Sequence, residues 1–264
     1  MQDDDALIAR ISGRLLPEPE VFDAAAGMLP DWVPDNPPSR PPEEHLMAPV
    51  WTRSRLERVM CLRFGFGHDQ VSPDTAAAAA AMGVTRRTVQ RWLHAEHGRS
   101  VAHIPVKRLE QLTKLLLPQA ETLAREEQQA RYAYKAIDGL RLPRKMGIKP
   151  AWEKQRWLET HRVVVLQIPV GHLRIRQLAI ARDEPSRVAE VARRGKVVDE
   201  ALVPTRFHAT VLVHETLAQL GPWRFQAGDD QVVQGFTQAW MVEGTTPKTH
   251  LSSAALLLTR ARRR

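Results

Sequence analysis

Apolar residues recur at helical spacing through the first half of the chain. This spacing predicts helices over residues 5–16 and 19–29 near the N-terminus. Residues 30–49 hold seven prolines in twenty positions, which is incompatible with a helix or a central strand. From residue 51 onward the helical spacing returns. It predicts helices over 52–65, 74–82, 86–96, 105–117 and 119–138.

The pattern changes after residue 150. β-Branched and apolar residues run through His161–Val170, which predicts a buried strand, and Arg174–Arg182 partly alternates between apolar and polar. Residues 186–194 predict a short helix that ends at Gly195. Further strands are predicted over 208–214, 223–226 and 231–242. We therefore expect the α+β fold class, with a mainly helical N-terminal half and a mixed C-terminal segment.

These patterns divide the chain into consecutive segments. Residues 1–29 form an acidic helical segment, and residues 30–50 form a Pro-rich linker. Residues 51–138 form a helical domain, residues 139–155 a basic linker, and residues 156–264 an α+β domain with a basic C-terminal tail. Each boundary falls where the composition shifts.

Residues 75–94, TAAAAAAMGVTRRTVQRWLH, meet the requirements of a helix-turn-helix. Two helices that cross closely need a small residue at the fifth position, which is Ala79, and the turn needs a residue that tolerates positive φ at the ninth, which is Gly83. Thr85 stands at the N-cap position of the second helix, and Asp74, or else Ser72 or Thr75, could cap the first. The apolar positions of the shared core are filled by Ala78, Met82, Val84, Val89 and Trp92.

The second helix of this unit has a polar outer face. Arginine forks can bridge guanine O6 and N7, glutamine can bridge adenine N6 and N7, and arginine or histidine can hold phosphate. This helix therefore has the side chains of a DNA recognition helix. The expected DNA-binding residues are Thr85, Arg86, Arg87, Thr88, Gln90, Arg91 and His94.

The segment resembles the helix-turn-helix superfamily of bacterial DNA-binding proteins. The phrase MGVTRRTVQRW, residues 82–92, follows the family's pattern of a small residue, Gly-Val, and then Ser/Thr-x-x-Thr-Val-x-Arg-aromatic. The resemblance covers about 20 residues firmly and implies sequence-specific binding to double-stranded DNA. A protein of this family would by default regulate transcription, most simply as a repressor. Arginine outnumbers lysine 30 to 8, which is typical of a GC-rich bacterium, its phage or its plasmid.

The charge distribution agrees with a polyanionic partner. The net charge of +8 combines a net −7 over residues 1–50 with a net +15 over the remaining residues. Basic side chains in the second linker and in the tail would add phosphate contacts without sequence preference. These accessory positions are Arg141, Arg144, Lys145, Lys149, Arg260, Arg262, Arg263 and Arg264.

The leucine stripe of residues 105–117, formed by Leu109, Leu112 and Leu116, has two readings. The first is the core of the helical domain. The second is a dimer seam that continues through Leu123, Ala130, Tyr134 and Ile137. A homodimer is expected in either case, because helix-turn-helix proteins commonly read two half-sites one helical turn apart.

Other classes of function lack their signatures. The single Cys61 lies in an apolar stretch and is expected in the core, and His94 with His97 has no third ligand, so we expect no metal site. Nucleophile and phosphate-loop motifs are missing, so we expect no enzyme and no cofactor. The acidic N-terminus and the lack of a long apolar run predict a cytoplasmic, nucleoid-associated protein without membrane contact.

A second resemblance concerns the layout of the chain, which is similar to that of terminal proteins of linear actinobacterial replicons. The comparable pieces are Thr88–Trp92, Lys107–Lys135 and Arg162–Pro169. This resemblance implies a replication or DNA-end function, in which a hydroxyl side chain would accept DNA covalently. Because it rests on layout, it identifies no such residue.

Overall fold

The computed structural model describes residues 51–94, 101, 103–140, 148–226, 238–243, 246 and 248–260. The chain divides into two units, Met1–His45 and Leu46–Arg264. The predicted segments 1–29 and 30–50 lie outside the described residues, which all belong to the second unit.

The N-terminal part of this unit is helical, as predicted. All five helices expected between residues 51 and 138 are present, and each begins within two residues of its predicted start. A short further helix, α8 (Pro150–Lys154), occupies the end of the predicted basic linker. The five are α3 (Arg53–Phe64), α4 (Thr75–Met82), α5 (Arg86–Leu93), α6 (Val106–Leu116) and α7 (Ala120–Leu140).

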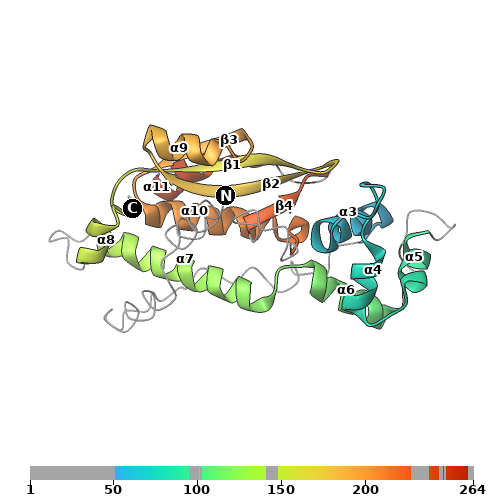
Figure 1. Cartoon of the computed structure of the whole chain (residues 1–264). Helices are drawn as coiled ribbons and strands as arrows, with labels where there is room; N and C mark the ends of the chain where they lie inside the picture. The colour runs from blue at the N-terminus through green and yellow to red at the C-terminus, as the bar shows by residue number, and fades with distance from the viewer. Residues whose placement is uncertain are drawn as a thin grey trace. The chain divides into compact units, whose positions relative to one another are not determined.

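The C-terminal part is built on an antiparallel sheet. Its strands are β1 (His161–Val170), β2 (Leu173–Arg182), β3 (Lys196–Val203) and β4 (Ala239–Met241), in the order β3-β1-β2-β4. Helix α9 (Pro185–Ala192) lies over one face, and α10 (Arg206–Gln219) with α11 (Leu251–Arg260) lies over the other (Figure 1). The α+β fold class is therefore confirmed.

Strand β1 is buried on both faces, which explains its uninterrupted apolar sequence. Val163 and Val165 pack with α10 and α11. Val164, Leu166 and Ile168 point the other way, into a core that also contains residues of α3–α6 and α9. Alternate residues of a strand face opposite sides, so a strand covered on both sides has no polar face to display. One hydrophobic core therefore joins the sheet to the helical part.

Two of the predicted strands are wrong. Residues 208–214 lie in α10, whose N-cap Thr205 accepts a hydrogen bond from the backbone N–H of His208 (3.3 Å). The apolar residues there are spaced for a helix lying on the sheet, with Ala209, Leu212 and Val213 buried on one side. Residues 223–226 form no strand, because a 3₁₀ turn over Gly221–Trp223 precedes a single bridge between Arg224 and Trp240.

The third of these predictions, over 231–242, is confirmed only at Ala239–Met241, and residues 231–237 lie outside the described residues. Strand β3 and helix α11 were not predicted. Strand β3 is an edge strand with alternating exposure, and its exposed positions are Lys196, Val198, Glu200 and Leu202. Asp199 and Glu200 interrupt the apolar residues in the middle of this strand, and both residue types are uncommon in strands, which weakens the strand signal of the sequence.

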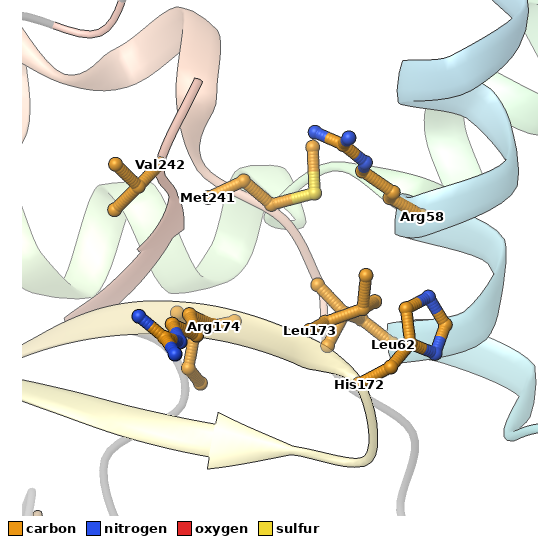
Figure 2. A pocket seen from close by; sticks show the side chains of 8 residues that line it. Arg58, Leu62, His172, Leu173, Arg174, Met241 and Val242 are labelled. Atoms are coloured by element: carbon orange, nitrogen blue, oxygen red, sulfur yellow. The ribbon is translucent and has the colours of Figure 1, made fainter. Parts of the chain in front are cut away.

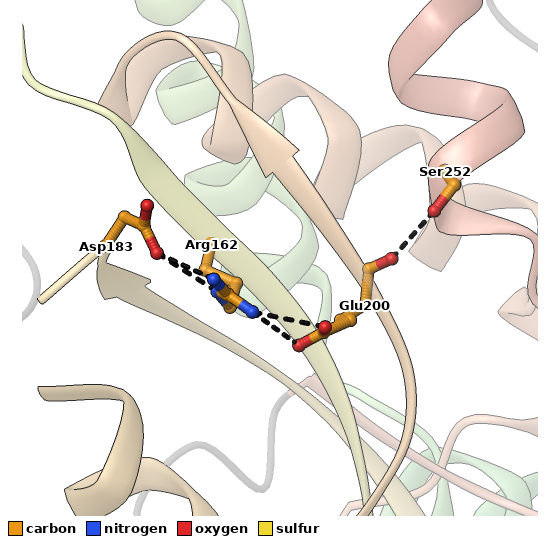
Figure 3. Close-up of polar contacts among 4 residues, drawn as sticks. All are labelled: Arg162, Asp183, Glu200 and Ser252. Carbon is orange, nitrogen blue, oxygen red and sulfur yellow. Dashed lines mark hydrogen bonds and ion pairs between the residues drawn. The ribbon is translucent and has the colours of Figure 1, made fainter. Parts of the chain in front are cut away.

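Strand β3 is tied to its surroundings by polar contacts. Arg162 on β1 bridges Asp183 (2.8 Å) and Glu200 (3.0 Å), as Figure 3 shows. The Ser252 hydroxyl donates to the backbone carbonyl of Glu200 (2.9 Å), and the Leu251 N–H donates to Asp199 (3.0 Å). A β-bulge interrupts the pairing of β3 with β1 next to these contacts. The bulge and α11 together shield the edge from pairing with other strands.

His161, at the start of β1, makes the stability of this part depend on pH. Burial lowers the pKa of His161 to about 4, and nearby Arg206 and Arg182 add repulsion against the imidazolium. An unfolded histidine titrates near pH 6.5, so between about pH 6.5 and 4 the unfolded state holds a proton that the folded state does not. The free energy of unfolding should therefore fall as the pH drops through this window.

We expect this histidine to remove up to about 2 kcal/mol of stability between pH 7 and pH 5. Urea unfolding at the two pH values checks this. His161→Asn lowers stability at both, but the loss between them should be smaller than in the wild type. An equal loss in the variant would show that His161 is not the titrating group.

Candidate nucleic-acid interface

Helices α4 and α5 form a tight unit whose turn follows the sequence-based prediction. The Asp74 carboxylate caps α4 by accepting from the N–H groups of Ala76 (2.8 Å) and Ala77 (3.0 Å). Gly83 ends α4 in the left-handed region, with φ 61° and ψ 42°, and the N–H of Val84 reaches the carbonyl of Ala79 (3.1 Å). These contacts satisfy backbone groups at both ends of α4.

Gly83 gives a prediction for stability. A Cβ at this position would meet no atom within 4 Å, so a substitution costs only the left-handed conformation, about 1–2 kcal/mol. We expect Gly83→Ala to lower the free energy of unfolding by that amount, measured with urea. Gly221→Ala is the matched control, because its Cβ also has open space and Gly221 has no positive φ. If the two substitutions lowered the free energy of unfolding equally, the cost would not come from the left-handed conformation of Gly83.

Helix α5 presents one apolar and one polar face. Thr85 caps the helix by accepting from the N–H of Thr88 (3.2 Å). Val89, Trp92 and Leu93 are buried, while Val84 is partly buried against the same core. The residues predicted to form the inner side of the unit therefore do so, and the opposite side of α5 is left to solvent.

Helix α6 and His103, which precedes it, support this unit through contacts that the sequence did not reveal. Arg108 (3.4 Å) and Gln111 (3.3 Å) both donate to the carbonyl of Met82, at the end of α4. The Nε2–H of His103 donates to the carbonyl of Trp92 at the end of α5 (3.0 Å). Side-chain donors to helix C-terminal carbonyls fix the ends of both helices. The sequence alone does not indicate which polar side chains will donate to the last carbonyl groups of a neighbouring helix.

The predicted DNA-binding residues lie together on the outer face of α5. Arg87, Arg91 and His94 are exposed, and Gln90 and Thr88 are partly exposed. No carboxylate occurs in residues 75–94, so neither helix carries an acid beside these basic side chains. The charge of this face is therefore available to an anionic partner.

Two of the predicted residues have contacts within the unit. The Nε–H of Arg86 donates to the hydroxyl of Thr75 (3.1 Å), which directs this side chain back across the start of α4. The hydroxyl groups of Thr85 and Thr88 lie 2.9 Å apart. This geometry suits Arg86 to a backbone phosphate beside α4 better than to a base edge.

The accessory basic residues are only partly described. Lys149 lies over the rings of Tyr132 (5.6 Å) and Trp152 (5.9 Å), and partial burial lowers the pKa of its ammonium group. This packing gives Lys149 a structural role beside its predicted one. The other predicted positions, Arg141, Arg144, Lys145 and Arg262–Arg264, lie outside the described residues, as does the side chain of Arg260.

The leucine stripe of α6 belongs to the core. Leu112 and Leu116 are fully buried, and Leu109 packs against the same cluster. The alternative seam along α7 is largely occupied within the chain, because Ala130 and Ile137 are buried and the Tyr134 hydroxyl donates to Glu215 on α10 (2.6 Å). Only Leu123 remains 37% exposed. The core reading of the α6 stripe is therefore confirmed.

Cys61 is buried in α3, as expected for a core position, and burial raises the pKa of its thiol to about 12. A thiol with this pKa stays protonated at neutral pH. His97 lies outside the described residues. Within the described ranges, His, Cys, Asp and Glu side chains form no group of three or more suited to a metal ion.

The pieces compared with terminal proteins fall on different elements: Thr88–Trp92 lies in α5, Lys107–Lys135 spans α6 and most of α7, and Arg162–Pro169 lies in β1.

Comparison with family models, curated proteins and solved structures gives no match. Among the described residues, no helix combines the length and apolar character needed to cross a bilayer.

Proposed function

We propose that the protein binds double-stranded DNA sequence-specifically by placing α5 in the major groove. The observation that carries this proposal is the division of α5: Val89, Trp92 and Leu93 are buried, and the outer face carries arginines, a glutamine and a histidine with no acid. A major groove accepts one α-helix, and these side chains match its donors and acceptors.

The proposed contacts assign different tasks to the outer residues. Arg87 and Gln90 face outward one turn apart and would read base edges, with arginine preferring guanine and glutamine preferring adenine. Arg86, held beside Thr75, would bind phosphate, and Arg91 with His94 would bind the backbone further along the helix. Neither a catalytic step nor a cofactor is needed for this function.

We infer transcriptional repression as the role, because occupancy of a site by such a protein suffices to block transcription. In this proposal the protein acts as a homodimer on the nucleoid in the cytoplasm, and each copy reads one half-site. A replication or DNA-end function would use the same interface. Mapping of bound sites across the genome separates the two, since a repressor occupies promoters and a terminal protein occupies replicon ends. A protein–DNA adduct that survives boiling in detergent would favour the second.

The basic C-terminal tail gives a separate prediction. Deletion of residues 260–264 should lower the affinity for all DNA sequences about equally, because these arginines would contact phosphates only. The slope of log affinity against log salt should flatten by roughly 0.9 for each phosphate that the shortened chain no longer neutralises. Fluorescence anisotropy with specific and scrambled duplexes measures both quantities. A weakening confined to the specific duplex would show that the tail reads sequence.

A further inference from the structure

A pocket of about 270 Å³ opens where α3 meets the sheet. Its walls come from Arg58 and Leu62 on α3, from the start of β2, and from Met241 at the end of β4. Figure 2 shows Arg58 extending from α3 towards β4, while Arg174 rises from β2. The pocket therefore lies between the helices that carry α5 and the C-terminal sheet. It is distinct from the outer face of α5.

The polar groups of this pocket are all basic or neutral. Arg58, Arg174 and His172 line it, and none of its lining residues is acidic. Both arginines are exposed, and in the part of the chain that the structure describes neither guanidinium has an ion-pair or hydrogen-bond partner. Arg162, by contrast, is ion-paired, because it bridges two carboxylates. Two unpaired guanidinium groups therefore line one cavity, Arg58 from α3 and Arg174 from β2, and their charge favours an anion there.

The rest of the wall is apolar. Leu62, Leu173 and Met241 line the pocket and are themselves buried. The imidazole of His172 packs edge-on against the ring of Phe66, with centroids 5.5 Å apart, which holds it at the rim. Binding sites for small molecules commonly combine such apolar walls with a few polar groups, in volumes of roughly 300–1,000 Å³. This pocket lies just below that range and suits a small ligand.

We propose that the pocket binds a small organic anion, in which a carboxylate or phosphate group contacts Arg58 or Arg174 and an apolar body contacts Leu62, Leu173 and Met241. Arginine forks bind both head groups through paired N–H donors. A phosphate of the DNA backbone shares the anionic chemistry but brings no apolar body. The apolar wall therefore favours a free ligand.

A bound anion would connect α3 to β2 and β4, since its contacts come from both sides of the pocket. A ligand that binds one arrangement of these elements more tightly shifts the protein towards it. Occupancy would then change the affinity of α5 for DNA. This consequence rests on the proposed function, whereas the binding itself does not.

Isothermal titration calorimetry of the full chain without DNA tests the site. The probes are benzoate and phenyl phosphate, with benzyl alcohol as the neutral analogue and inorganic phosphate as the anion without an apolar body. We expect one or both organic anions to bind at millimolar concentration or below. The neutral alcohol and inorganic phosphate should bind at least about tenfold more weakly.

Arg58→Gln, Arg174→Gln or both should weaken binding of the organic anion by about tenfold or more. Both side chains are exposed and unpaired, so the fold should tolerate the changes. Arg193→Gln, at an exposed arginine beyond α9, is the matched control and should leave binding unchanged. Failure of both anions to bind, or equal binding by wild type and the two pocket variants, would overturn the proposal. So would inorganic phosphate binding as tightly as phenyl phosphate.

DNA affinity measured with and without saturating anion then tests the coupling separately. A change in affinity supports the regulatory consequence. Anion binding with no change in DNA affinity would leave the site standing and contradict the coupling. Anion binding by a chain that binds no specific DNA would contradict the proposed function and leave the site intact.

Discussion

Replacing Arg87 and Gln90 together by alanine should weaken binding to the specific site by about 30-fold or more. Each side chain is proposed to make a paired contact with one base, and each such pair contributes about 1–3 kcal/mol of discrimination. Non-specific binding should weaken less, because most phosphate contacts remain. Mobility-shift titrations with a specific duplex and a scrambled duplex measure the two affinities.

A matched control removes the same residue types elsewhere. Arg125 and Gln119 are exposed at the N-terminal end of α7, so Arg125→Ala with Gln119→Ala changes the charge equally and leaves α5 intact. We expect this variant to keep its specificity. Both double variants should show the circular dichroism spectrum and urea midpoint of the wild type, because all four side chains lie outside the core. Unchanged specificity in the Arg87 and Gln90 variant would refute the groove assignment.

Trp92→Ala should have the largest effect on stability, about 3–5 kcal/mol. The indole is 3% exposed and lies in the core shared by the helices and the sheet, so its removal leaves a cavity that the fixed ends of α4 and α5 cannot close. A loss of this size is a large share of the total stability of an ordinary domain. Urea unfolding followed by circular dichroism gives the value.

Arg91→Ala is the control on the same helix. Its side chain is exposed, so the substitution should change the free energy of unfolding by no more than about 0.5 kcal/mol while still weakening DNA binding. The substitutions at Trp92 and Arg91 thus distinguish the buried face of α5 from its exposed face. Similar stability losses from both substitutions would mean that the orientation of α5 is wrong.

The α4–α5 unit was predictable because its requirements are local. A left-handed position needs a residue such as Gly83, an N-cap needs a side-chain acceptor such as Thr85, and the burial of Val89 and Trp92 follows from helical spacing. Nothing distant in the chain has to be known for any of these. The contacts of α6 with the end of α4, and of His103 with the end of α5, could not be predicted, since they depend on how the third helix and the residues before it pack.

The sheet was only partly predictable because its signals depend on tertiary context. Residues 208–214 are rich in β-branched side chains and suggest a strand, yet they lie in α10, where packing against Val163 and Val165 outweighs intrinsic preference. Strand β1 was predictable in full, because burial on both faces leaves an apolar run. The pocket beside Arg58 joins residues that are more than 100 positions apart, so no local pattern indicates it.

Selection of binding sites from random duplex DNA by the full chain tests the central claim most directly. The wild type should enrich one sequence motif, and the variant that carries both Arg87→Ala and Gln90→Ala should no longer enrich it. The Arg125 and Gln119 variant should recover the wild-type motif. Retention of DNA without any enriched motif, or the same motif from all three proteins, would contradict sequence-specific binding through α5.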